Sequence, residues 1–224
     1  MDFITFVMLQ GQNTTIDWQK IVDIITNITI AGAAVITAVY GSKGLASWRA
    51  QLTGRIEYDI ARTLLKQTYV LENEIFSSRA PMITANEFPD DFPFLDGASK
   101  EPEEYARGFA YVYNNRLKPV FSAYRELQAT SFDAASVWGT EIFQKVEDFH
   151  KVILWLYASM DVDVMNKQSK GENFRSDPSY GQKVQADIFR SSEGNDSLSV
   201  SLKAAVKGIE EAVKPHLEAF HTRK

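Results

Sequence analysis

Three histidines are the residues best suited to acid–base or metal chemistry in this chain, and their spacing supports neither role. His216 and His221 stand five positions apart, which places them on different faces of a helix and disfavours a shared metal ion. His150 follows Glu147 and Asp148, so it could act as a general base with an acidic neighbour. A histidine within an apolar helix is more often packed or hydrogen-bonded, and we favour that interpretation.

Other catalytic and cofactor-binding patterns are missing from the sequence. The chain has no cysteine, which excludes a disulfide framework and a thiolate metal site. The segment GSKG, residues 41–44, lacks the second half of a phosphate-binding loop, and no Rossmann-type glycine pattern occurs. No arginine stands within six residues before any histidine, so the Arg-to-His pair of helical ribonucleases has no match. We therefore expect no enzyme, no cofactor and no metal.

The composition is that of a globular protein with an acidic balance. Of the 224 residues, 45% are hydrophobic and 24% are charged, which argues against general disorder. This length suits one sizeable core with an appendage. The formal net charge of −5 disfavours nucleic-acid binding, because that affinity comes from clustered Lys and Arg.

The other notable polar side chains stand at the start of an apolar segment. Asp23 and Asn27 lie one helical turn apart, and the nineteen residues from Ile24 to Ser42 carry no formal charge. At 1.5 Å per residue these nineteen residues make a helix of roughly 28 Å, close to the thickness of a bilayer's hydrocarbon core. We predict a transmembrane helix over residues 21–42, after a short N-terminal segment, 1–20. The alternative is that residues 21–40 form the buried central helix of a soluble bundle.

The residues around this segment predict its orientation. Trp18 precedes it, and Tyr40 and Trp48 stand at its other end, where aromatic rings favour the headgroup level. Only Lys20 precedes the span closely. Four basic residues follow it: Lys43, Arg49, Arg55 and Arg62. The positive-inside bias then places the C-terminal part in the cytoplasm. Asp2 stands where a secretory signal would be basic, so we expect an uncleaved single-pass anchor.

One face of the predicted span combines polar and small residues. At 100° per residue they fall within about a third of the helix circumference, with Ile30 as the one bulky member. We call this face the small-polar stripe: Asp23, Thr26, Asn27, Ala34, Thr37, Ala38 and Gly41. Lipid cannot satisfy an amide or a carboxylate, and small residues let helices approach closely. Because the chain has no second comparable span, we expect a homo-oligomer, with Asp23 and Asn27 facing a pore if copies surround an axis. Alternatively, these two side chains simply lie at the membrane surface.

Periodic apolar residues after the span predict an all-α fold, with a bundle of about four principal helices in residues 43–224. The first helix should end near Arg79, before Pro81. Further helices are expected from Pro102 to about residue 127, from about 133 to 160, and from about Leu198. Pro119 should kink or end the first of these helices, and Pro215 should kink or end the last. Residues 81–101 and 166–197 are expected to be loops, with only residues 183–190 able to form a short helix.

The loop at 81–101 combines aromatic and acidic residues. Phe88, Phe92, Phe94 and Leu95 alternate with carboxylates, as in segments that dock onto a partner protein. The alternative, which we favour, is that the phenylalanines fold back onto the helical core while the carboxylates stay in water.

The segment 44–81 resembles a block found in uncharacterised small bacterial membrane proteins with one N-terminal span. The matching steps are Trp48 with Arg49, Glu57 with Tyr58, Ala61 with Arg62, and Leu64 with Leu65. This resemblance implies a bacterial inner-membrane protein with a helical cytoplasmic part. In layout, an anchor followed by a helical domain, the chain is also similar to CRISPR-associated accessory proteins that form membrane pores, which implies a role in antiviral defence.

These observations favour an oligomeric, membrane-anchored helical protein, with membrane lipid and further copies of itself as partners. Its cytoplasmic domain would bind a protein partner, and its spans would assemble, as a pore or another membrane-acting effector. The alternative is a passive membrane-localised adaptor or scaffold in which the anchor only positions a binding domain.

Overall fold

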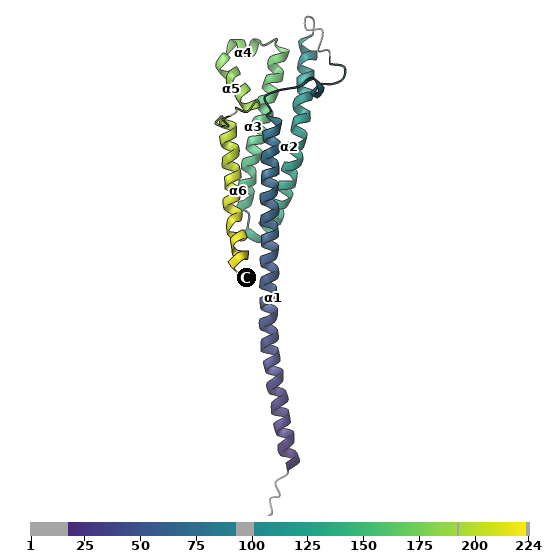
Figure 1. The fold of residues 1–224 in the computed structure, drawn as a ribbon, viewed down its shortest axis with the longest axis vertical. Helices are drawn as coiled ribbons and strands as arrows, with labels where there is room; N and C mark the ends of the chain where they lie inside the picture. Colours follow the sequence, from purple (N-terminus) through teal and green to yellow (C-terminus); the bar gives the residue numbers. More distant parts are fainter. Residues whose placement is uncertain (1–17, 93–100, 192, 223–224) are drawn as a thin grey trace, which may run out of the picture. The chain divides into compact units, whose positions relative to one another are not determined.

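The described part of the chain is entirely helical in this computed structural model, which covers residues 18–92, 101–191 and 193–222 (Figure 1). These ranges contain no β-strand, which confirms the all-α prediction. The described residues form six α-helices and one short 3-10 helix: α1 (Trp18–Ser78), η1 (Ala85–Glu87), α2 (Pro102–Trp138), α3 (Glu141–Gln168), α4 (Glu172–Ser176), α5 (Pro178–Ile188) and α6 (Ser197–Thr222).

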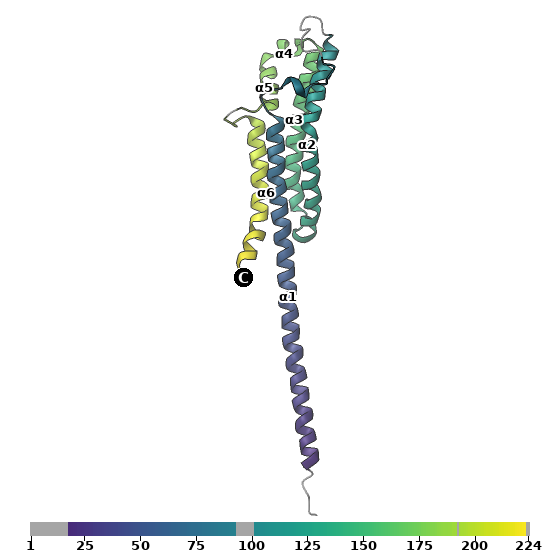
Figure 2. The same ribbon diagram turned by 45° about the vertical axis from the view of Figure 1, so that its right-hand side comes forward.

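The chain divides into two compact units, Met1–Leu52 and Thr53–Lys224, and α1 contributes residues to both. In the second unit the later part of α1 runs beside α2, α3 and α6 (Figures 1 and 2). Its core draws on α1 through Ala61, Leu64, Leu71 and Ile75, which are all fully buried. The larger buried side chains on the other helices are Leu117, Leu127, Phe149, Ile153, Leu156, Ile188, Leu198 and Ile209.

Several predicted helix boundaries are confirmed. α1 ends at Ser78, next to the predicted Arg79, and α6 begins at Ser197, next to the predicted Leu198. α2 begins at Pro102, and proline suits this position because the first N–H groups of a helix have no partner within the helix. Glu103 and Glu104 lie in its first turn, where their negative charge is favourable near the positive end of the helix dipole.

Other boundaries differ from the prediction. Pro119 and Pro215 were expected to kink or end their helices; both helices continue past the proline, which excludes an end there and does not contradict a kink. The break before α3 occurs at Gly139, whose φ of 93° suits glycine, so the helix expected from residue 133 begins at Glu141. Residues 166–197 are not one loop, because they contain α4 and α5 as well as the end of α3.

The apolar side chains that recur along α1 at mostly three- and four-residue intervals do not share one environment. Leu64, Leu71 and Ile75 are buried, whereas four earlier members of the same pattern are 45–59% exposed: Leu45, Trp48, Leu52 and Ile56. On α3, Leu154 and Tyr157 have the spacing of core residues and are about half exposed. Periodicity thus identified the helices more reliably than it identified their buried faces.

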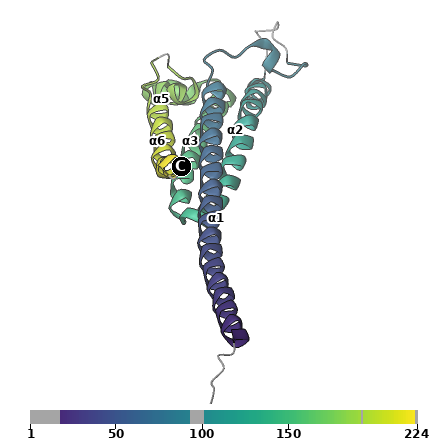
Figure 3. The ribbon, with the colours of Figure 1, turned by 60° about the horizontal axis from the view of Figure 1, so that its bottom comes forward.

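A buried arginine joins three helix ends in the second unit. The side chain of Arg79 is 2% exposed, and its Nε and Nη2 donate to the carbonyl oxygens of Asp187 and Ala186 at 2.7 and 2.8 Å. Nη2 also donates to Asp196 Oδ1 and Nη1 to Ser199 Oγ, both at 2.8 Å. Figure 3 shows that α5 lies at the end of this unit where α1 finishes and α6 begins. Arg79 therefore fixes the position of these ends.

Asp196 completes this junction by capping α6. It accepts from the Ser199 amide at 2.9 Å and from the Ser199 hydroxyl at 2.7 Å. Although burial acts to raise the pKa of Asp196, the hydrogen bonds from Ser199 and Arg79 together lower it. The carboxylate therefore stays charged opposite the guanidinium.

A second buried network joins α2, α3 and α5. Asp163 on α3 is 1% exposed and accepts from Tyr113 Oη at 2.6 Å, Lys167 Nζ at 2.5 Å and Gln185 Nε2 at 2.8 Å. Burial is the main reason that the pKa of Tyr113 is raised, so its hydroxyl stays a donor to Asp163. The Asp163 carboxylate is therefore hydrogen-bonded to side chains of α2, α3 and α5 while it is almost fully shielded from water.

We predict that Arg79→Ala strongly destabilises the second unit. Removing the guanidinium leaves Asp196 and two carbonyl oxygens without their buried donor, which should lower the free energy of unfolding by about 3–5 kcal/mol. Denaturant unfolding of the full-length protein in mild detergent, followed by tryptophan fluorescence, measures this change. Arg107→Ala is the matched control, because Arg107 is 77% exposed and 3.9 Å from Glu104. Equal loss in both variants would contradict the role given to Arg79.

Candidate functional site

The described residues do not bury the apolar part of α1. The most apolar stretch of the described part of α1 is long enough to cross a membrane, and none of it is buried. Val22, Ile24, Ile25, Ile28 and Ile30 are each more than half exposed. This exposure disfavours the alternative of a buried central helix, because such a helix would have its apolar side chains covered by the bundle.

Polar groups inside this segment are largely satisfied by the helix itself. The hydroxyls of Thr29 and Thr37 donate to the carbonyl oxygens of Ile25 and Ala33, both at 2.8 Å. Ser42 donates to Val39 O at 2.9 Å. Such hydrogen bonds to the preceding turn remove the cost of placing a hydroxyl in an apolar medium. Thr29, Thr37 and Ser42 are therefore compatible with lipid.

All seven members of the small-polar stripe lie on α1 with exposed side chains: Asp23, Thr26, Asn27, Ala34, Thr37, Ala38 and Gly41. Thr37 is the member whose hydroxyl is bonded within the helix. A Cβ at Gly41 would have no atom within 4 Å, so space is open on this side of the helix. The stripe is thus a surface on which another helix could pack closely.

The two described phenylalanines of the 81–101 segment fold back onto α2. Phe88 is 8% exposed, with its ring centroid 4.4 Å from that of Phe92 and 5.1 Å from that of Phe109. The Phe92 ring lies over Gly108, where an added Cβ would come within 2.1 Å of it. Asp90 and Asp91 stay exposed. This packing agrees with the fold-back interpretation, and it leaves Phe88 without the exposed ring that docking needs. Phe94 and Leu95 lie outside the described residues.

An ion pair holds the start of this segment against α2. Arg116 Nε and Nη2 donate to the two carboxylate oxygens of Glu87 at 2.5 and 2.9 Å. The same guanidinium donates to the carbonyl oxygens of Ala80 and Met82 at 2.8 and 2.6 Å. The hydrogen bonds from Arg116 are the main reason that the pKa of Glu87 falls to about 2, while burial acts in the opposite direction.

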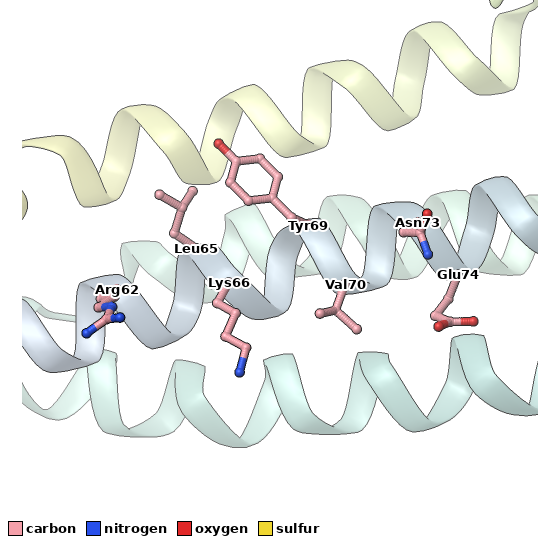
Figure 4. Close-up of a pocket in the computed structure, with 7 residues that line it drawn as sticks. All are labelled: Arg62, Leu65, Lys66, Tyr69, Val70, Asn73 and Glu74. Carbon is pink, nitrogen blue, oxygen red and sulfur yellow. The ribbon is translucent and has the colours of Figure 1, made fainter.

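An open groove of about 570 Å³ runs along α1 within the second unit. Leu65 and Tyr69 point toward α6 on one side, and Lys66 and Val70 point to the opposite side, toward α2 (Figure 4). Arg62, Asn73 and Glu74 complete the lining. Tyr69 Oη donates to Glu210 Oε1 on α6 at 2.7 Å, and this bond is the main reason that the pKa of Tyr69 is raised. The groove is open and is lined by both apolar and charged side chains, and Tyr69 is the lining residue with a described hydrogen bond to α6.

The histidines are placed as packed side chains. His150 Nδ1 is 3.2 Å from Glu147 Oε1, and its ring stacks on Tyr124 with centroids 5.4 Å apart. The His216 ring stacks on Trp138 at 4.1 Å, with Nδ1 3.8 Å from Glu57 Oε2. The side chain of His221 lies outside the described residues. Among the described residues, no group of three His, Asp or Glu side chains is placed to hold a metal ion.

The sequence reasoning missed contacts between distant residues. Two of these contacts join residues that are far apart in the chain: Tyr113 with Asp163, and Glu57 with His216. The groove on α1 likewise depends on the neighbouring helices. Two signals were present: an acidic residue within an apolar helix, and an Arg directly after a helix end. Both indicated buried pairing, but neither identified the partner.

Comparison with known protein-family models, curated proteins and solved structures finds no match for this chain.

We predict that Glu87 makes stability depend on acid pH. Its pKa is about 2 in the folded chain and near 4.5 when unpaired, so its contribution is complete above about pH 4.5 and disappears as the pH falls through 2. Glu87→Gln should lower the free energy of unfolding at pH 7 by about 1–2 kcal/mol, because partial exposure weakens the pair. The variant should also lose part of the pH dependence between 4.5 and 2.

Denaturant unfolding at a series of pH values tests this prediction. Glu104→Gln is the control, because its pair with Arg107 is exposed and 3.9 Å long. Parallel pH profiles for the wild-type chain and Glu87→Gln would contradict it.

Proposed function

We propose that this chain is a membrane-anchored protein that self-associates through the small-polar stripe of α1. The observation that carries the proposal is the complete exposure of an uncharged helical segment long enough to cross a bilayer. At about 25 cal/mol per Å², leaving so much apolar surface in water is strongly unfavourable. Lipid is the medium that covers a segment of this length on every side.

Orientation follows from charge. Lys43 and Arg49 stand directly after the uncharged segment, and the positive-inside bias places the second unit on the cytoplasmic side. That unit, with its helical core and buried ion pair at Arg79, is the part of the chain available to a cytoplasmic partner. A bacterial source and a defence role remain expectations from the resemblance alone.

Self-association is supported by the chemistry of the stripe. Asn27 lies within the uncharged segment with an exposed amide, and an amide in lipid gains free energy by bonding to another helix. Ala34, Ala38 and Gly41 continue the same face, and their small side chains allow close contact between helices. A second copy is the helix that offers the complementary surface at the same depth.

Self-association is tested by enlarging this face. Asn27→Leu and Ala34→Leu should shift the full-length protein toward monomer in mild detergent, because the first removes the amide and the second adds bulk at the contact. Gly32→Leu is the matched control, since Gly32 lies on the opposite face with open space around it. Mass measurement by light scattering gives the result. An unchanged mass in both stripe variants, or an equal change in the control, would refute the proposed face.

Membrane anchoring is tested separately with a chain beginning at Lys43. The full-length protein should require detergent for extraction, whereas the shortened chain should be soluble and smaller in assembly. A full-length protein that stays soluble and monodisperse without detergent would overturn the anchor.

Pore formation is the finer part of the proposal. If several copies surround an axis, the Asp23 carboxylates form a ring at the mouth and the Asn27 amides form a ring deeper in the span, and an acidic ring favours cations. Purified protein in lipid vesicles should then release K⁺ in preference to Cl⁻, and Asp23→Asn should reduce that preference. Vesicles that stay tight with correctly oriented multimers would limit the function to anchoring and assembly.

A further inference from the structure

Three large apolar side chains form an exposed ridge on α1 immediately after the uncharged segment. Leu45, Trp48 and Leu52 are 48%, 59% and 45% exposed, and all belong to the first unit. We call them the juxtamembrane ridge. The opposite face of the same turns carries Ala46 and Ala50, so the apolar bulk lies on one side of the helix.

Lipid covers at most the first part of this ridge. At 1.5 Å per residue, Leu45, Trp48 and Leu52 lie roughly 4, 9 and 15 Å beyond Ser42. The polar layer on each side of the hydrocarbon core is only about 5–8 Å thick. When Ser42 marks the edge of the core, Trp48 lies at the outer edge of the polar layer and Leu52 lies beyond it in water. A one-sided apolar ridge that leaves the membrane in this way needs a protein surface.

The spacing of the ridge identifies the kind of surface. Ala34, Ala38, Gly41, Leu45, Trp48 and Leu52 follow one another at intervals of four, three, four, three and four residues. This alternation is the seam of two helices packed side by side with a slight supercoil. At 100° per residue the six positions span about 80°, so the ridge continues the face of the small-polar stripe within one unit.

The partner is then a second copy of the chain. A single-pass anchor holds every copy parallel and at the same depth, so Leu45 of one copy lies level with Leu45 of the next. We propose that α1 pairs with α1 of a second copy along the juxtamembrane ridge, extending a membrane contact into a parallel coiled coil outside the bilayer. This inference rests on the proposed membrane anchoring and self-association.

Cysteine cross-linking tests the ridge directly, because the natural chain has no cysteine. Single variants Leu45→Cys, Trp48→Cys and Leu52→Cys are made in the full-length protein, and Ala46→Cys and Ala50→Cys are the matched controls on the opposite face. Disulfides form only when the two Cα atoms come within about 7 Å. Mild oxidation in native membranes should give at least about fivefold more disulfide dimer at the three ridge positions than at the two controls.

Two further variants separate this inference from the proposed function. Ala34→Cys and Gly41→Cys report the contact inside the membrane. Cross-linking at these positions but not at the ridge would overturn the ridge while leaving self-association intact. Equal cross-linking at ridge and control positions would also overturn it, and no cross-linking at any position would remove both proposals. Cross-linking at the ridge alone would retain this inference and move the contact out of the membrane.

Discussion

The exposed apolar segment of α1 is the constraint on which the functional interpretation depends. Nineteen uncharged residues follow one another, and every described side chain among them is exposed. A helix satisfies its own backbone hydrogen bonds, and Thr29 and Thr37 bond to the preceding turn, so this segment has little need of water. What remains polar is concentrated on one face, at Asp23, Thr26 and Asn27. In our proposal, lipid covers the apolar faces of this segment and a second helix covers the polar one.

The second unit depends on a different kind of interaction. Its long helices bury ordinary aliphatic side chains, which hold the helices together without fixing where each one ends. Arg79 supplies that information, because its donors reach carbonyl oxygens at the end of α5 and a carboxylate at the start of α6. Arg116 does the same for the segment after α1 by binding Glu87 and two carbonyl oxygens. The connecting segments are thus positioned by charged side chains and the helices by apolar ones.

Sequence reasoning predicted what depends on local chemistry. The C-terminal end of α1 and the start of α6 followed from Pro81 and from the onset of apolar periodicity, and the inward packing of Phe88 was the favoured interpretation. It failed where tertiary contacts decide the outcome. α5 was expected only in part. In the structure Gln185 donates a hydrogen bond to Asp163, and both Val184 and Ile188 are buried in the core. Leu154 has the spacing of a core residue, yet no neighbouring helix covers it enough to bury it.

The candidate site illustrates the same division more sharply. A helical pattern gives the positions that share a face, and this was sufficient to group Asp23 with Asn27 and Ala34. It does not say which positions the fold will cover: Leu52 and Leu64 belong to the same periodic pattern, and of these two only Leu64 is buried. The apolar face that folding leaves uncovered on α1 is informative for that reason. Folding of one chain buries Leu64, Leu71 and Ile75, whereas our proposal assigns the earlier apolar positions to lipid or to another copy of the chain.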